Sequence, residues 1–194
     1  MHTHVGARLF ITGIPTSGKS YLAKKIAQQV DGVAVLLDDL KKSLAEDPTY
    51  KKWTNFYLDL DEGTYLSNTS PEEKWMNLVK QSEGLWPAFL AQIESYRNET
   101  KPVIFECVNL LPHLMAPLGF PGVVLVGSTY ESVLERNIKD PRWGATPELQ
   151  ELEAKIFFFV ERPRYIGEAK KYGYPVFETA DEAFEQASKV LKSN

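Results

Sequence analysis

The stretch Gly13-Ile-Pro-Thr-Ser-Gly18-Lys19-Ser20 decides the fold of this chain of 194 residues. It matches the pattern G-x-x-x-x-G-K-[ST] at each fixed position. The apolar run at 8–12 comes directly before it and predicts a buried strand, and apolar residues at Leu22, Ile26 and Val30 behind it predict an amphipathic helix. A strand, a glycine-rich turn and a helix in this order are typical of a phosphate-binding loop (P-loop).

The chemistry of a polyphosphate explains the residue types in this stretch. The backbone must wrap the phosphates closely, and Gly13 and Gly18 allow an approach that a side chain would obstruct. The helix N-terminus adds N–H donors and a favourable dipole. We expect Lys19 to bridge the β- and γ-phosphates of ATP and the Ser20 hydroxyl to hold Mg²⁺. The nucleotide contacts predicted here are Gly13, Ile14, Pro15, Thr16, Ser17, Gly18, Lys19, Ser20 and Tyr21.

Further along the chain, strands alternate with helices. Short apolar runs predict four more strands, at 33–37, 102–107, 122–127 and 175–177. Strands that alternate with helices indicate a parallel sheet that is covered on both faces. The sequence therefore predicts an α/β fold, a three-layer α/β/α P-loop NTPase fold with a mostly parallel five-stranded sheet and a mobile lid.

Local signals mark several helix ends. Ser70-Pro-Glu-Glu73 predicts a helix start with a capping box and a proline in the first helical position. We expect the residues at 147–161 to be helical and Arg162-Pro163 to break that helix and begin another. The stretch from about 47 to 69 has weak periodicity and stays undetermined.

Composition limits the class of protein. The chain has 22 Lys and Arg against 26 Asp and Glu, a net charge of −4, and 43% hydrophobic residues. This balance is typical of a folded protein and argues against a nucleic-acid partner, which usually meets a basic excess. Cys107 is the single cysteine and cannot form an intramolecular disulfide, which favours a cytoplasmic protein. No apolar run reaches about 18 residues, so we expect no membrane partner. We expect the protein to be a monomer or homodimer.

Other classes of P-loop protein fit less well. A GTPase needs N-K-x-D, and in Asn137-Ile-Lys-Asp140 the lysine comes one place too late. No D-x-x-G switch follows the third predicted strand, and the chain is short for an ABC-type ATPase and has no such signature.

With these motifs in place, the chain resembles the small P-loop kinases grouped with nucleoside monophosphate kinases, including the 2-phosphoglycerate kinase-like and chloramphenicol phosphotransferase-like branches. The resemblance depends on the N-terminal P-loop, on Asp38 directly after the second strand, on the acid ending Val103-Ile-Phe-Glu106, and on an arginine-bearing segment that begins with Arg136. The chain length predicts a single domain over 1–194. The resemblance implies an acceptor-binding region at about 39–70 and a lid at about 137–147.

The resemblance also implies roles for particular residues. Glu106 is expected near Mg²⁺, through water. Arg136 and Arg142 are expected to bind the nucleotide and stabilise the transferring phosphoryl group. Arg162 and Arg164 are expected to be either further phosphate ligands or solvated surface residues.

Two acidic residues after the second strand are assigned different roles. Ligands bind at the carboxyl ends of strands in open α/β sheets, so Asp38 is placed to orient an acceptor hydroxyl and take its proton. We expect Asp39 to cap the helix that follows.

These observations predict an ATP- and Mg²⁺-dependent phosphotransferase acting on a small-molecule acceptor, with a hydroxyl favoured over a phosphate. Its expected catalytic residues are Lys19, Asp38, Arg136 and Arg142, and Ser20 and Glu106 are its expected metal residues. One alternative is a nucleoside monophosphate kinase in which lid arginines and Lys41 and Lys42 bind the acceptor phosphate. Another is an ATP-binding regulatory or partner protein without a dedicated acceptor.

Overall fold

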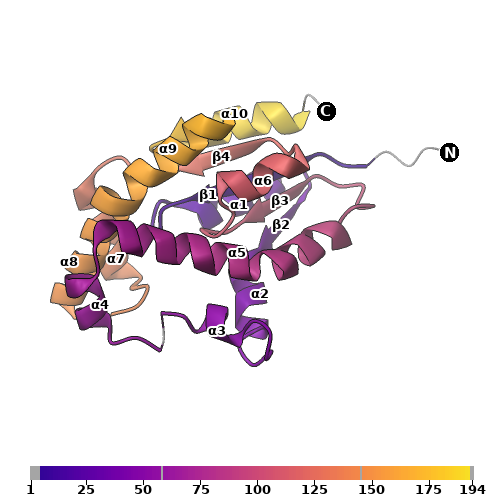
Figure 1. Cartoon of the computed structure of the whole chain (residues 1–194). Helices are drawn as coiled ribbons and strands as arrows, with labels where there is room; N and C mark the ends of the chain where they lie inside the picture. The colour runs from indigo at the N-terminus through magenta and orange to yellow at the C-terminus, as the bar shows by residue number, and fades with distance from the viewer. Residues whose placement is uncertain (1–4, 58, 145, 193–194) are drawn as a thin grey trace.

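A computed structural model describes residues 5–57, 59–144 and 146–192 (Figure 1). Five strands form one sheet in the order β2-β3-β1-β4-β5, and each adjacent pair is parallel. The strands are β1 (Arg8–Gly13), β2 (Val33–Leu36), β3 (Val103–Glu106), β4 (Gly122–Leu125) and β5 (Val176–Phe177). The central β1 leads directly into the P-loop, so the sheet presents that loop at the middle of its carboxyl edge.

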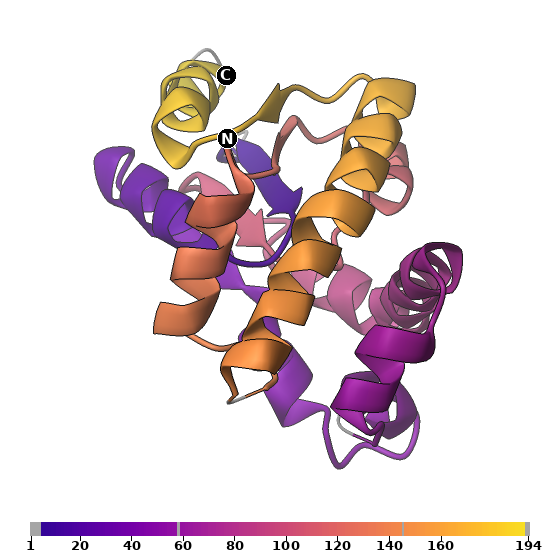
Figure 2. The ribbon, with the colours of Figure 1, turned by 90° about the vertical axis from the view of Figure 1, so that its left-hand side faces the viewer.

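Helices cover both faces of the sheet, as Figure 2 shows with the layers seen from the side. On one face α1 (Lys19–Gln29) and α10 (Ala180–Lys192) pack on β1 through a cluster that includes Leu22, Ile26 and Ala183. On the other face α5 (Pro71–Ser95) packs on β1 and β3 through a cluster that includes Leu85 and Phe89. The three-layer α/β/α P-loop fold predicted from the sequence is confirmed.

The helix α5 begins as its sequence predicts. The Ser70 hydroxyl accepts a hydrogen bond from the Glu73 N–H at 3.2 Å, and the Glu73 carboxylate accepts one from the Ser70 N–H at 3.1 Å. Pro71 occupies the first turn, where its missing N–H costs nothing. Further along, a Cβ at Gly84 would lie 2.2 Å from the ring of Trp53, so glycine is what allows α3 (Lys51–Thr54) to pack here.

The prediction that Arg162-Pro163 breaks a helix is wrong. The helix α8 (Pro147–Lys155) passes into a π-helical segment, η2 (Ile156–Glu161), and then into α9 (Arg162–Tyr172) without interruption. Figure 2 shows the three as one continuous column in orange. A π turn shifts the hydrogen-bond pattern ahead of the proline, and this relieves the clash that a proline ring makes with the carbonyl four residues earlier.

The undetermined stretch folds into short helices around one end of the molecule. In chain order the remaining helices are α2 (Leu37–Ser43), α4 (Glu62–Asn68), α6 (Pro112–Met115), η1 (Ala116–Leu118) and α7 (Tyr130–Lys139). Figures 1 and 2 both show α4 beside α8, far from α4 in the sequence. Among the described residues, none of the helices combines the length and apolar character that a membrane span needs.

Candidate functional site

A cavity of about 890 Å³ opens at the carboxyl edge of the sheet. The P-loop and the end of β3 form one end of it, which we call the phosphate end. The helices α2, α4 and α5, the lid and η2 form the other, which we call the acceptor end. A cavity of this volume, about 890 Å³, lies in the upper part of the range of ligand pockets.

The P-loop has the backbone conformation that its glycines predict. Gly13 has a φ of 128°, and a Cβ there would lie 1.8 Å from the carbonyl oxygen of Leu125 on β4. Gly18 has a φ of 96° and is the N-cap of α1. Thr16 has a φ of 60°, a conformation that is unusual for a β-branched residue, and such strain is typical of functional loops.

Lys19 is buried at the base of the loop. Its Nζ donates a hydrogen bond to the carbonyl of Ile14 at 2.7 Å, and so lies under the curve of the loop. Burial lowers the pKa of Lys19, because it disfavours the charged form, while the negative charges of Glu106 and Asp38 act to raise it. An anion bound beside this ammonium group would therefore compensate for the water contacts that burial removes.

Ser20 and Glu106 lie together, as their expected metal role requires. The Ser20 hydroxyl donates a hydrogen bond to the Glu106 carboxylate at 2.8 Å. In the sheet Glu106 pairs with Ile11 on one side and Leu36 on the other, and it is only 2% exposed. Burial raises the pKa of Glu106, although Lys19 and the hydrogen bond from Ser20 oppose this.

Oxygen atoms of this kind are the ligands that Mg²⁺ prefers. Within the described ranges no group of three or more His, Cys, Asp or Glu side chains is arranged to hold a metal ion. A hydroxyl and one nearby carboxylate fit Mg²⁺, because Mg²⁺ commonly takes few protein ligands and completes its coordination with water and substrate phosphates.

Asp38 lies within the first turn of α2, because β2 ends at Leu36 and the helix begins one residue later. Its carboxylate forms an ion pair with Lys41 at 2.6 Å and accepts a hydrogen bond from the Cys107 thiol at 3.4 Å. Burial acts to raise the pKa of Asp38, but the charges of Lys41 and Lys19 outweigh it and lower the pKa below its ordinary value. Asp38 is therefore ionised and close enough to Lys19 to interact with it.

The prediction that Asp39 caps α2 is wrong. The N-cap is Leu36, without a side-chain hydrogen bond, because the helix begins before the acidic pair. Asp39 instead forms an exposed ion pair with Lys42 at 2.8 Å.

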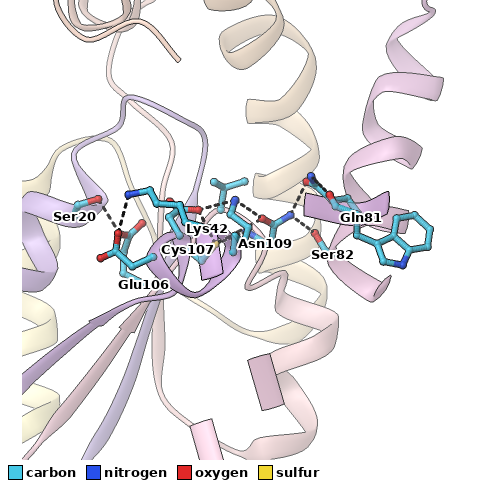
Figure 3. Close-up of polar contacts among 12 residues, drawn as sticks. Ser20, Lys42, Gln81, Ser82, Glu106, Cys107 and Asn109 are labelled. Atoms are coloured by element: carbon cyan, nitrogen blue, oxygen red, sulfur yellow. Dashed lines mark hydrogen bonds and ion pairs between the residues drawn. The ribbon is translucent and has the colours of Figure 1, made fainter. Parts of the chain in front are cut away.

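A polar network beyond Asp38 was not anticipated from the sequence (Figure 3). Lys41 donates to the side-chain oxygen of Asn109 at 3.1 Å, and the Asn109 amide donates to Gln81 at 3.1 Å and to Ser82 at 2.9 Å. In Figure 3 this network ends at Gln81 and Ser82 on one side, and the separate Ser20–Glu106 pair lies on the other side. The network links α2, the segment after β3 and α5. In the sequence, only the position of Asn109, three residues after Glu106, points to this polar network.

The expected lid arginines approach the phosphate end. The Nη1 of Arg136 donates to the carbonyl of Thr16 in the P-loop at 3.2 Å. Arg142 forms an ion pair with Asp140 at 3.2 Å, and its charge contributes to lowering the pKa of Lys19. Both arginines line the cavity.

The lid itself is a short connection between α7 and α8, and Ala145 within it lies outside the described residues. Its two ends are joined by buried Asn137, whose amide donates to the carbonyl of Gln150 at 3.0 Å and to the Glu153 carboxylate at 2.8 Å. This cross-link holds Arg142 and its neighbours over the cavity.

Arg162 and Arg164 lie outside the described lining of the cavity. Arg162 forms an ion pair with Glu178 at 2.7 Å, and Arg164 forms one with Glu72. Of the two roles left open for them, this arrangement favours the surface one.

Glu161 is a cavity residue that the sequence did not reveal. It is the last residue of η2, and one of its carboxylate oxygens is buried with no hydrogen-bond partner in the described part of the chain. Burial raises the pKa of Glu161 to about 7, and the charge of Lys19 opposes the rise. Its position depends on the π turn, for which no sequence pattern was available.

Three aromatic rings form a wall at the acceptor end. Ring centroids lie 5.7 Å apart between Tyr57 and Tyr65, 5.8 Å between Tyr57 and Trp143, and 5.9 Å between Tyr65 and Trp143. The rings come from the segment after α3, from α4 and from the lid, and all three line the cavity. We call them the aromatic wall.

Comparison with protein-family models and with curated proteins found no match. Solved structures do match. A shikimate kinase from Acinetobacter baumannii in complex with shikimate is 11% identical, with a TM-score of 0.56 over 98% of this chain and 96% of that chain. A shikimate kinase from Bacteroides thetaiotaomicron is 15% identical, with a TM-score of 0.51 over 96% of this chain and 98% of that chain.

The chain has the fold of the small P-loop kinases. A gluconokinase from Sinorhizobium meliloti 1021 also matches, with 18% identity and a TM-score of 0.46 over 98% of this chain and 94% of that chain. Identities this low show the fold alone, so the chemistry of the site must be argued from its residues.

Proposed function

We propose that this protein is an ATP- and Mg²⁺-dependent phosphotransferase that moves the γ-phosphoryl group of ATP to a hydroxyl of a small-molecule acceptor. One observation carries the proposal: a single cavity holds both the P-loop with Lys19, Ser20 and Glu106, and the ionised Asp38 beside them. The first set suits a nucleoside triphosphate, and the second suits an acceptor.

At the phosphate end, the N-terminus of α1 offers its N–H groups to the phosphates, and Lys19 supplies a buried positive charge. Mg²⁺, when bound, would neutralise charge on the phosphate oxygens, and Ser20 and, through water, Glu106 would hold it there. Arg136 and Arg142, which line the cavity, would donate hydrogen bonds to the transferring group, where negative charge develops.

At the acceptor side, Asp38 would accept a hydrogen bond from the attacking hydroxyl and take its proton as the new phosphate ester forms. The lowered pKa keeps this carboxylate ionised before the reaction. Proton transfer late in the reaction suits a carboxylate of this kind, because a phosphoryl transition state is loose and the hydroxyl stays protonated until bond formation is advanced.

The Asp38–Lys41 pair also supports a hydroxyl acceptor over a phosphate acceptor. The alternative of a nucleoside monophosphate kinase assigns Lys41 to the acceptor phosphate. Lys41 instead forms an ion pair with Asp38 and donates a hydrogen bond to Asn109. A carboxylate at this place would repel an ionised phosphate, whereas it would orient a hydroxyl.

The test is acceptor-dependent ADP release in the presence of Mg²⁺, with a panel of polyols, sugars, sugar acids and amino alcohols. We expect at least one hydroxyl compound to stimulate ADP release well above the rate with ATP alone, and to shift the unfolding temperature further when ATP is present. Stabilisation by ATP and Mg²⁺ that no acceptor enhances, without acceptor-dependent ADP release, would instead favour the regulatory alternative.

A further inference from the structure

The carboxylate of Glu161 has no obvious task in phosphoryl transfer. It lines the cavity from η2, one of its oxygens is buried, and that oxygen has no partner among the residues that the structure describes. The cation that acts on it is Lys19, whose Nζ already donates to the Ile14 carbonyl and lies where phosphates would bind. A cation bound in the cavity would pair with this unpartnered oxygen and stabilise the ionised carboxylate.

The aromatic wall lines the same cavity as this carboxylate. Burial raises the pKa of the Tyr57 hydroxyl, and the negative charge of Glu161 raises it further. The same two influences act on Tyr65. Aromatic faces attract cations, and the attraction is strongest for groups such as alkylammonium that shed water easily.

Three lysines of the acceptor end are already engaged, and the first of them, Lys42 on α2, forms an ion pair with Asp39. Lys41 is paired with Asp38 and Asn109, and buried Lys74 donates to the carbonyls of Leu66 and Thr69. Glu153, whose pKa is raised by burial, adds a second carboxyl group to the lining.

We infer that the acceptor carries a cationic nitrogen, a primary or quaternary ammonium group, in addition to its hydroxyl, and that Glu161 and the aromatic wall bind this cation. The inference rests on the proposed function, because it assigns the acceptor to an amino alcohol or amino sugar class. The hydroxyl would lie toward Asp38 and the nitrogen toward Glu161, so that the acceptor spans the space between them.

Two isosteric pairs of probes test the inference directly. Choline and 3,3-dimethylbutan-1-ol differ in the charged nitrogen, and glucosamine and glucose differ in the amino group. Binding is measured by calorimetry with ADP and Mg²⁺ present, at constant ionic strength. We expect the cationic member of at least one pair to bind about tenfold more tightly than its neutral partner, since a tenfold change is a modest cation–π and ion-pair contribution.

The variant Glu161→Gln keeps the size of the side chain and removes its charge. We expect it to weaken binding of the cationic probe about tenfold and to leave the neutral probe unchanged. Glu135→Gln, at an exposed position on α7, is the matched control and should change the binding of neither the cationic nor the neutral probe. Equal binding within both pairs, no binding of either cationic probe, or a preference that Glu161→Gln retains would overturn the inference.

ADP release measured in parallel separates this inference from the proposed function. Turnover of an anionic acceptor such as gluconate, together with no binding of the cationic probes, would overturn the inference and leave the phosphotransferase standing. Binding of ATP and Mg²⁺ with no acceptor in the panel stimulating ADP release would overturn the proposed function. A uniform loss of kcat in Glu161→Gln with every acceptor, and no change in cation preference, would assign Glu161 to the reaction step and overturn cation recognition.

Discussion

The two ends of the cavity are built in different ways. The phosphate end comes mainly from one continuous segment, the P-loop and the start of α1, whose backbone conformation depends on Gly13 and Gly18. The acceptor end is assembled from side chains on α2, α4, α5, the lid and η2, which are far apart in the sequence.

The difference shows which parts of such a site tolerate change. A polyphosphate presents the same atoms whatever the acceptor, so a fixed backbone cradle suffices for it. Acceptor recognition needs particular side chains at particular places, and these can be exchanged without disturbing the cradle. Substitutions at the two ends should therefore have separable effects, and the predictions below use this separation.

The largest effect is expected at the phosphate end. Lys19→Met should lower kcat/KM about a thousandfold, because a preorganised charge on the transferring phosphate is lost in a buried site. Lys24→Met, on the exposed side of the same helix, should leave activity unchanged. Steady-state ADP release measures both, and a Lys19→Met enzyme that keeps near wild-type activity would remove this residue from the mechanism.

The next largest effect is expected where the two ends meet. Asp38→Asn should lower kcat about a hundredfold with a hydroxyl acceptor, because the side chain can no longer take the proton, while ATP affinity stays the same. Asp39→Asn is the matched control, since Asp39 pairs with Lys42 on the surface. Equal turnover by the two variants would refute the base role of Asp38.

At the acceptor end a substitution of Glu161 is expected to raise stability, whereas the two preceding substitutions lower activity. Burial raises the pKa of Glu161 to about 7 from an ordinary value of 4.5, so the folded protein favours the protonated carboxyl. The stabilisation from this group is complete below the ordinary value and is lost as the pH rises through about 7.

Glu161→Gln cannot ionise and avoids that loss. On going from about pH 5 to about pH 8, the variant should therefore gain about 1–3 kcal/mol of unfolding free energy relative to the wild type. Urea unfolding at both pH values measures this, with Glu135→Gln as control. A difference that does not change with pH would show that Glu161 is ionised without penalty.

The smallest effect is expected from the aromatic wall. Trp143→Leu should raise the KM for the acceptor about fivefold to tenfold, because a cation–π contact and apolar contact area are lost. The KM for ATP should stay the same, because Trp143 lies at the acceptor end. A parallel rise in both constants would mean that the two ends are not separable.

The phosphate end could be predicted from the sequence better than the acceptor end. The P-loop, the parallel sheet and the capping box of α5 depend on local spacing, and each was predicted from residues within a few positions of one another. Asp38 is predicted at the site because ligands bind at the carboxyl ends of strands, and Glu106 because of the family resemblance. Their places beside Lys19 agree with that expectation.

The acceptor end could not be predicted in the same way. The aromatic wall needs α4 to lie beside the lid, and no local pattern fixes a contact over such a separation. Glu161 faces the cavity because of a π turn, whereas regular helical spacing and a break at Pro163 were expected. The N-cap of α2 is Leu36, three residues before Asp39, because the strand β2 passes into the helix without a polar residue between them.

Phosphorus NMR of the complete reaction tests the central claim most directly. Enzyme, ATP, Mg²⁺ and the best acceptor of the panel are followed together, with Asp38→Asn alongside. The account predicts that a phosphomonoester resonance grows as the γ-phosphate resonance of ATP falls, and that Asp38→Asn slows this about a hundredfold. Formation of inorganic phosphate and ADP alone, or an ATP signal that stays unchanged with every acceptor, would contradict it.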